Sequence, residues 1–256
     1  MKQVKAQKKI KTEGLVIKTV DVNDSNRLIV ILTNDMGIIT AFAGGVKKPT
    51  SKLSAGCGLF VYSFFGLTKT GSNYRVDEVI PKELFYKIRY DIEGVALASY
   101  FCELVSGMSF EGDCSNELLR PLLNALYLIT QKNKPLKLIK AVTEMRIMSA
   151  AGFMPDLSGV SCGHNYENSV VYLDFIGGVL VCSNCAKKIN GFKGKILNKT
   201  VLDALRYILN SDVKKCYSFN IPQNDLNNLC YITENYVIEQ TERKCKTLST
   251  LKELLQ

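Results

Sequence analysis

The chain has little of what enzymatic chemistry usually requires. Its 256 residues contain a single histidine, His164. One histidine excludes most arrangements in which histidine activates a serine or a cysteine, unless His164 itself were the base. A phosphate loop is also missing, because Gly191–Lys195 has the wrong glycine and lysine spacing, and no paired-histidine zinc protease motif occurs. No carboxylate cluster stands out as a two-metal nuclease site. The sequence therefore favours a binding protein over an enzyme.

Long apolar segments are missing as well. No stretch approaches the roughly 18 consecutive apolar residues of a membrane-spanning helix, and the opening MKQVKAQKKIK is polar and basic, unlike a signal peptide. The nine cysteines are odd in number. Six of them are scattered singly: Cys57, Cys102, Cys114, Cys216, Cys230 and Cys245. This pattern is typical of reduced thiols rather than a disulfide framework. We expect a soluble, cytosolic protein.

Positive charge is what the chain has in excess. It carries 33 Lys and Arg against 24 Asp and Glu, a net charge of +9. Residues 1–53 alone hold ten of the cations and four of the carboxylates. Such a balance favours contact with nucleic acid or an anionic membrane. The basic N-terminal segment is either a phosphate-binding arm or a solubilising end.

The hydrophobic pattern changes its period near Pro81. Before it, short runs rich in Val, Ile and aromatic residues predict five strands with glycine-containing corners. These strands are expected at 14–18, 27–33, 37–42, 59–67 and 72–80. Five short strands in under 80 residues suit a small closed barrel such as an OB-fold.

Helical spacing dominates after Pro81. Helices are predicted at 91–108, after Ser115, at 136–151, at 200–209 and at 226–255. Pro121 implies a late start or a kink in the second helix, and 136–151 has the pattern of an amphipathic helix. The predicted fold class is α+β and multidomain. It comprises an OB-fold β-barrel (1–80), an α-helical domain (81–157 and 190–256) and an inserted zinc-knuckle-like segment (158–189).

The insertion contains the candidate metal ligands Cys162, His164, Cys182 and Cys185. Structural zinc takes four thiolate or imidazole ligands, usually in two clusters. Cys182 and Cys185 form a standard half-site, and Gly163 eases the tight turn between Cys162 and His164 because glycine accepts positive φ. The alternatives are a knuckle that has lost its metal and unrelated thiols. A catalytic zinc is less expected with one histidine.

A basic loop follows the third predicted strand. Its lysines Lys47, Lys48 and Lys52 could neutralise phosphates, or the loop could be an ordinary solvated surface. Arg27 opens a strand that could join the same face. Tyr74, adjoining Arg75, is the best candidate for stacking on bases. Tyr62 and Phe64 are further candidates, although aromatic residues on strands more often pack in a core.

Four segments resemble the RecO family of bacterial recombination mediators. They are Glu13–Ile17, Arg27–Thr33 with Gly37, Gly44–Ser51, and Ala151–Leu157 followed by Cys162-Gly163, Gly177-Gly178 and Cys182-x-x-Cys185. The last segment is the most specific, and the resemblance extends over the whole chain. The chain departs from the family at Gly159, which stands where many members have a first cysteine.

The resemblance implies a non-enzymatic role in DNA repair and recombination. Such proteins bind single- and double-stranded DNA, anneal complementary strands, pair with RecR and help load RecA on strands coated by single-strand-binding protein. The barrel would contact DNA through Arg27, Lys47, Lys48 and Lys52. A groove in the helical domain would take the acidic C-terminal tail of single-strand-binding protein, with Lys132, Lys134, Lys137 and Lys140 as candidates. The expected location is cytoplasmic and nucleoid-associated.

Other functions suit the same residues. An RNA-binding or ribosome-associated zinc protein would also combine basic charge, a barrel and a knuckle. A zinc-dependent hydrolase using the Cys/His cluster is an enzyme alternative, and a structural subunit whose charge serves a protein partner is a third.

Overall fold

The computed structural model describes residues 8–71, 73–108, 116–161, 163 and 170–254. The chain forms two compact units, which comprise residues 1–130 and 131–256. Within the described residues, no helix is both long enough and apolar enough to cross a membrane.

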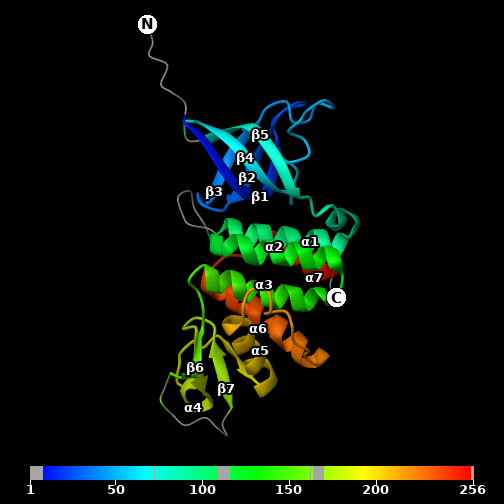
Figure 1. The fold of residues 1–256 in the computed structure, drawn as a ribbon. Coiled ribbons are helices and arrows are strands. Elements are labelled where there is room, and N and C mark those ends of the chain that lie inside the picture. Colours follow the sequence, from blue (N-terminus) through cyan, green and yellow to red (C-terminus); the bar gives the residue numbers. More distant parts are fainter. Residues whose placement is uncertain (1–7, 72, 109–115, 162, 164–169, 255–256) are drawn as a thin grey trace. The chain divides into compact units, whose positions relative to one another are not determined.

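The first unit begins with a closed five-stranded barrel (Figure 1). Its strands are β1 (Lys9–Asp21), β2 (Arg27–Thr33), β3 (Ile38–Ala43), β4 (Tyr62–Thr70) and β5 (Asn73–Glu83). They follow the order β1-β2-β3-β5-β4, in which β1 also pairs with β4. The predicted OB-fold-like barrel is thereby confirmed.

Strand β1 closes the barrel because it is long enough to pair with two neighbouring strands, β2 and β4. Its first half pairs with β4 and its second half with β2, and the register shifts between Val16 and Lys18. Gly14 pairs with both neighbours. A Cβ atom at Gly14 would lie 2.5 Å from the Ile31 side chain and 2.8 Å from the Leu32 carbonyl oxygen. Only glycine therefore allows the strands to approach this closely.

Alternating apolar residues of the strands fill the barrel. Ile29 and Ile31 on β2 and Phe65 and Leu67 on β4 are at most 1% exposed. This two-residue period is the one expected of strands with one face buried. Val46, from the loop after β3, packs into the same core at 3% exposure.

Three helical elements complete the first unit. They are the 3₁₀ helix η1 (Tyr86–Tyr90), α1 (Ile92–Ser106) and α2 (Asn116–Gln131). The carboxylate of Asp91 accepts a hydrogen bond of 3.3 Å from the Gly94 N–H and caps α1. Helix α2 begins before Pro121, which lies inside it. The predicted alternative of a late helix start is therefore wrong.

The second unit is built around α3 (Leu136–Ala150). The helix predicted at 136–151 is confirmed, but its predicted amphipathic character is wrong. Ten of its fifteen residues are buried, including the polar Lys140, Thr143 and Glu144. A helix that is buried on most of its circumference shows little amphipathicity, and its polar residues therefore need internal partners.

Three further helices pack in the second unit. They are α5 (Lys199–Asn210), α6 (Gln223–Thr241) and α7 (Lys246–Leu254). The predicted helix at 200–209 is confirmed. The long helical pattern at 226–255 is instead divided between α6 and α7, because Glu242 has a left-handed φ of 51° at the end of α6.

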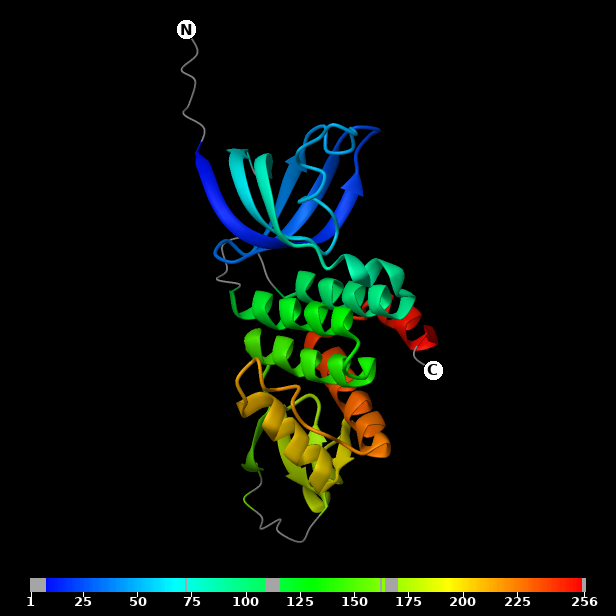
Figure 2. The same ribbon diagram turned by 45° about the vertical axis from the view of Figure 1, so that its right-hand side comes forward.

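The second unit also contains a small sheet (Figure 2). It contains β6 (Asp156–Val160), β7 (Val171–Asp174), β8 (Val179–Cys182) and β9 (Gly194–Leu197), and the short helix α4 (Ser183–Ala186) follows β8. The strand order is β6-β8-β7-β9, with β6 and β8 parallel. These four strands were not predicted from the sequence, which indicated a metal-braced loop over much of this segment.

Candidate nucleic-acid interface

The basic loop between β3 and β4 is fixed to the turn between β1 and β2. The Gly45 N–H, at a positive φ of 66°, donates a hydrogen bond of 2.8 Å to the Asn26 side-chain oxygen. The Lys47 N–H donates to the Ser25 carbonyl oxygen at 3.1 Å. Val46, buried in the barrel between them, anchors the loop. The lysines of this loop therefore project from a defined backbone.

Two of the predicted DNA-binding cations share one carboxylate. Asp21 accepts a charge-assisted hydrogen bond from Arg27 Nε at 2.8 Å and lies 3.0 Å from Lys47 Nζ. The hydrogen bond from Arg27, followed by that from Lys47, holds the pKa of Asp21 below its ordinary value. The structure thus brings Arg27 and Lys47 together, as predicted for one face, but leaves this group of three with a single net positive charge.

Lys48 and Lys52 differ from that pair. Both are exposed, and neither forms an ion pair with any residue that the structure describes. Their ammonium groups are therefore the most available positive charges of the loop, because a bound phosphate would displace only water and counterions.

The stacking role predicted for Tyr74 does not agree with the structure. Tyr74 is 4% exposed and belongs to the barrel core, so its ring has no face open to a base. Arg75 points outward, with 52% of its side chain exposed, and pairs with Asp77 at 2.9 Å. The strand period explains both outcomes, since neighbouring residues of a strand face opposite sides.

Tyr62 and Phe64 are half-buried on the outer side of β4. The Tyr62 hydroxyl bonds to Glu13, and Lys82 lies over its ring with Nζ 5.5 Å from the centroid. Lys82 also pairs with Glu13 at 2.7 Å. Tyr62 thus belongs to a local cluster that holds its ring in place.

The described half of the candidate metal centre lies where β8 meets α4. Cys182 ends β8 and stands directly before α4, and Cys185 lies within that single turn. A spacing of three residues on one helical turn places two side chains on the same side. Gly163 has the predicted positive φ, at 67°. Cys162 and His164 lie outside the described residues.

Ser161, directly before Cys162 in the sequence, lies beside β8. Ser161 donates from its backbone N–H to the Leu180 carbonyl oxygen at 2.9 Å. Leu180 is two residues before Cys182. Ser161 therefore lies close to the Cys-x-x-Cys half-site, whose two thiols are of the kind that zinc binds.

A second candidate site lies among α3, α6 and α7 in the second unit. It is a cavity of about 360 Å³. We call it the α3–α6–α7 pocket; its lining is Lys137, Lys140, Asn227, Cys230, Tyr231, Glu234, Leu251 and Lys252. Burial raises the pKa of the Cys230 thiol to about 12, so this thiol stays protonated and unreactive.

Beneath this pocket lies a buried ionic cluster. Lys140, only 4% exposed, places its Nζ 2.8 Å from Glu144 Oε1 and 3.0 Å from Glu234 Oε2. Thr233 donates its hydroxyl to the other Glu144 oxygen at 2.6 Å. Lys252 pairs with the other oxygen of Glu234. Burial by itself would lower the pKa of Lys140, but the two carboxylates outweigh burial and raise it. Lys140 is therefore not an available basic group.

Lys137 is the cation of the pocket that remains for a ligand. Its side chain contacts the neutral amide oxygen of Asn227 at 3.4 Å, and no carboxylate among the described residues pairs with it. The half-exposed Tyr231 supplies apolar surface nearby, whereas Leu251 is fully buried in the wall of the pocket. A cation beside apolar side chains suits an acidic peptide better than a neutral small molecule.

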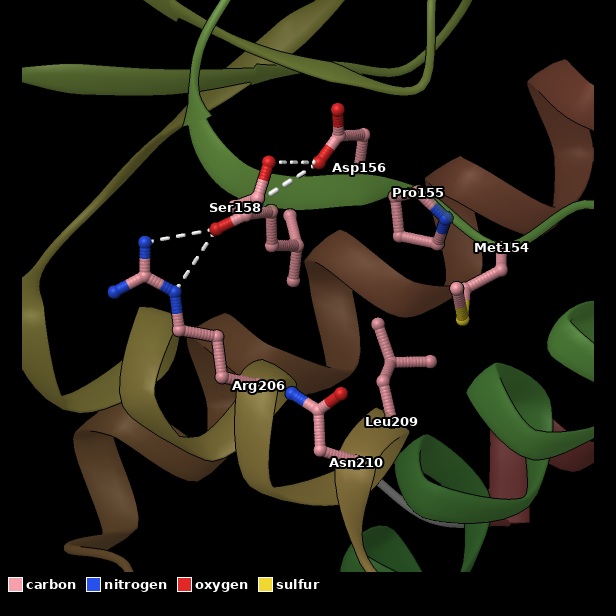
Figure 3. A pocket seen from close by; sticks show the side chains of 8 residues that line it. Met154, Pro155, Asp156, Ser158, Arg206, Leu209 and Asn210 are labelled. Carbon is pink, nitrogen blue, oxygen red and sulfur yellow. Dashed lines mark hydrogen bonds between the residues drawn. The ribbon is translucent and has the colours of Figure 1, made fainter.

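In another pocket of the second unit, the charged side chains already form hydrogen bonds with neighbouring residues (Figure 3). This cavity of about 310 Å³ lies between α5 and the chain around β6. Arg206 donates to the Leu157 carbonyl oxygen at 3.0 and 2.8 Å. Asp156 accepts two hydrogen bonds from Ser158, at 2.9 and 2.6 Å. These groups brace the wall of the pocket, and we assign it no ligand.

Comparison with known protein families decides the relationship. The model for the N-terminal part of recombination protein O matches residues 7–85, and the model for its C-terminal part matches residues 89–249. The chain belongs to the RecO family. The first match coincides with the barrel, so the RecO N-terminal part corresponds here to β1–β5.

Curated relatives support the same assignment over nearly the whole RecO chain. A DNA repair protein RecO from Acetivibrio thermocellus is 32% identical over 248 residues, covering 96% of this chain and 97% of the relative. One from Alkaliphilus metalliredigens is 32% identical over 235 residues, covering 91% and 94%. One from Clostridium perfringens is 29% identical over 246 residues, covering 95% and 97%.

Sequence reasoning missed the pocket of this RecO chain. It indicated Lys137 and Lys140 as basic candidates, but it gave them equal weight with Lys132 and Lys134, which do not line the pocket. The carboxylates of Glu144 and Glu234 distinguish Lys140, which they neutralise, from Lys137, which stays available to a ligand. Glu144 is four residues after Lys140, which is a readable helical spacing, whereas Glu234 and Lys252 come from other helices and left no sequence signal.

Proposed function

We propose that this chain acts in DNA repair as a non-enzymatic mediator that binds DNA and anneals complementary single strands. The names of its relatives support a repair role. The observation that carries the DNA-binding part is the fixed loop that presents Lys48 and Lys52 without carboxylate partners, next to Arg27 and Lys47.

The proposed mechanism requires no bond chemistry. Two complementary strands repel each other because both carry one negative charge per nucleotide. Lysines that contact the phosphates release counterions and reduce this repulsion. Complementary strands then meet more often, and base pairing completes the reaction without further help from the protein.

An annealing assay tests this proposal. Two complementary oligonucleotides are mixed with the protein, and duplex formation is followed by fluorescence energy transfer as salt rises from about 50 to 200 mM. We expect annealing to fall steeply over this range. The triple substitution of Lys47, Lys48 and Lys52 by Ala should weaken DNA binding with little change in the unfolding midpoint.

The matched control removes equal charge elsewhere. Lys187, Lys188 and Lys214 are all exposed in the second unit, and their replacement by Ala should leave annealing close to normal. Salt-insensitive annealing, or a triple loop variant that binds as tightly as the original chain, would contradict the proposal. Competition between single-stranded DNA and RNA of the same sequence distinguishes it from an RNA-binding function, in which RNA would win.

We propose further that the α3–α6–α7 pocket receives the acidic C-terminal tail of single-strand-binding protein. Lys137 would pair with a tail carboxylate, while the exposed Tyr231 would contact apolar residues of the tail. This contact would bring the mediator to a coated strand. Pairing with RecR and assistance to RecA loading are further parts of the proposed role.

Peptide binding tests the pocket. A fluorescent acidic peptide copying the tail should bind, and Lys137→Ala should weaken that binding about tenfold, since charge-assisted hydrogen bonds contribute on the order of 1.5 kcal/mol or more. Lys132→Ala is the control, because Lys132 does not line the pocket. Equal losses in both variants would show only a general effect of charge.

Zinc binding is the remaining part of the proposal. Cys182 and Cys185, with Cys162 and His164, would hold one structural zinc ion, which would brace the segment that connects β6 to β8. Metal analysis of the purified protein should give one zinc per chain. Cys182→Ser with Cys185→Ser should abolish it and destabilise the second unit, whereas a protein that contains no zinc when prepared in its presence would contradict the assignment.

A further inference from the structure

The short helix η1 presents an unusual surface next to the barrel. Tyr86 is 55% exposed and Tyr90 is 85% exposed. Two basic residues, Lys87 and Arg89, lie between them in sequence, and both are exposed. Single exposed aromatic residues are common on proteins, but two tyrosines interleaved with two cations on five residues form a recognisable pattern.

The 3₁₀ period explains how the pattern is displayed. Residues three apart are aligned in such a helix, and the backbone bonds Ile88 N–H to Phe85 and Asp91 N–H to Ile88, both at 3.1 Å, establish this period. Phe85 and Ile88 form one ridge, which is buried at 6% and 1% exposure. The helix therefore turns two ridges to solvent, and each joins one tyrosine to one cation: Tyr86 with Arg89, and Lys87 with Tyr90.

Nearby carboxylates have other partners. Glu83 accepts the backbone N–H groups of Leu84 and Phe85 at 3.1 and 3.3 Å, and Asp91 caps α1. Lys87, in contrast, forms no ion pair with any described residue. The two ridges thus combine aromatic faces with cations that form no ion pair with a carboxylate among the described residues.

The ridges are attached to the end of the same loop that carries the basic residues. Arg89 Nη2 donates to the Leu59 carbonyl oxygen at 3.3 Å. The next residue, Phe60, pairs with Val16 of β1, five residues before Asp21, where Lys47 is held. Five residues of strand span about 17 Å. Single-stranded DNA that follows this path from Lys47 to η1 fits the site size of roughly 4–16 nucleotides known for OB-folds.

We propose that η1 is a base-stacking platform for single-stranded DNA, with Tyr86 and Tyr90 against base faces and Lys87 on the backbone. This inference rests on the proposed DNA-binding function and extends it beyond phosphate contact. Tyrosine can stack on any base, because every base offers a π-face. The platform would therefore hold unpaired bases without reading their sequence.

The test separates base contact from phosphate contact. Binding is measured for an oligothymidylate and for an abasic phosphodiester chain of the same length. The original chain should bind the oligothymidylate more tightly, and Tyr86→Ala with Tyr90→Ala should remove this preference. Stacking losses are roughly 5- to 150-fold per base, and binding to the abasic chain should not change.

Three further variants keep the result interpretable. Tyr86→Phe with Tyr90→Phe should retain the preference, because the ring persists. Tyr90→Ala alone should lose part of it. Tyr127→Ala, which removes a tyrosine of 54% exposure from α2, should bind both chains normally.

The possible failures differ in kind. If the original chain binds neither oligonucleotide at low salt, the proposed function itself fails. If it binds both and the double alanine variant keeps its preference for bases, only the platform is overturned, and the ridges become a surface for a protein partner. Equal losses on both chains would also overturn the platform, since stacking cannot act on an abasic chain.

Discussion

Two groups of lysines illustrate opposite uses of the same side chain. In the barrel loop, Lys48 and Lys52 are exposed and form no ion pair with a described residue. In α3, Lys140 is buried between Glu144 and Glu234. A buried ammonium must be neutralised by partners, whereas an exposed one is stabilised by water and can exchange that water for a phosphate. Burial therefore decides which lysines hold the fold together and which are available for a ligand.

Removing the buried lysine should have the largest effect. Lys140→Ala leaves Glu144, which is 0% exposed, without its cation. Breaking a buried pair on one side costs about 3–5 kcal/mol, so we expect the free energy of unfolding of the second unit to fall by that amount in urea titration.

The control for this substitution is an exposed pair. Lys193 pairs with Glu239 at 2.7 Å, and 56% of its side chain is exposed. Lys193→Ala should therefore cost only about 0–1 kcal/mol. Similar losses for Lys140→Ala and Lys193→Ala would remove the contrast between buried and exposed lysines.

The ion pairs of Lys140 and of Asp21 should lose their contribution to stability at opposite ends of the pH range. The carboxylates raise the pKa of Lys140 against the effect of burial, so its stabilisation is complete below the ordinary lysine pKa and is lost as pH rises through the raised value. The pKa of Asp21 is lowered by Arg27 and Lys47. Its contribution is present above the ordinary aspartate pKa and is lost as pH falls through the lowered value.

Urea titration across pH checks these signs. We expect Lys140→Ala to flatten the alkaline decline in stability. Asp21→Asn should remove a smaller contribution, which is present at neutral pH, and should flatten the decline in stability on the acid side. An alkaline decline that is the same in the original chain and in Lys140→Ala would show that the ionic cluster is not its source.

The smallest expected effect concerns DNA affinity. Asp21→Asn removes the carboxylate that Arg27 and Lys47 share, and it should make both cations available to phosphate. We expect tighter binding of single-stranded DNA and a salt dependence steeper by about 0.7 in the slope for each new phosphate contact. Filter binding at several salt concentrations measures both. Weaker binding would mean that Asp21 serves to position the cations.

The barrel could be predicted because its signals are local. Alternating apolar residues and glycine-containing corners define β1–β5, and the strand bounds agree to within a few residues except at β1, which extends to Lys9 and Asp21 at its two ends. The same alternation should have warned that Tyr74 faces inward, since Val76 on its side of β5 is also buried. The stacking prediction gave more weight to the neighbouring Arg75 than to this period.

The second unit was harder to predict because its decisive contacts are distant in sequence. Glu234 reaches Lys140 from a helix 94 residues further along the chain, and Lys252 pairs with Glu234 from a third helix. No local pattern records such a meeting. The strands β6–β9 contain only four or five residues each, which is too short for a clear alternating pattern.

The sequence by itself determined the family relationship, the barrel, the excess of positive charge in residues 1–53 and the cysteine pattern, because each is recorded in residues close together along the chain. Only the tertiary structure decided which cations are available. It paired Arg27 and Lys47 with Asp21, enclosed Lys140 between two glutamates, left Lys48, Lys52 and Lys137 without carboxylate partners among the described residues, and turned Tyr86 and Tyr90 outward. Charge is a property of the sequence, but its availability depends on burial and on partners that folding brings together.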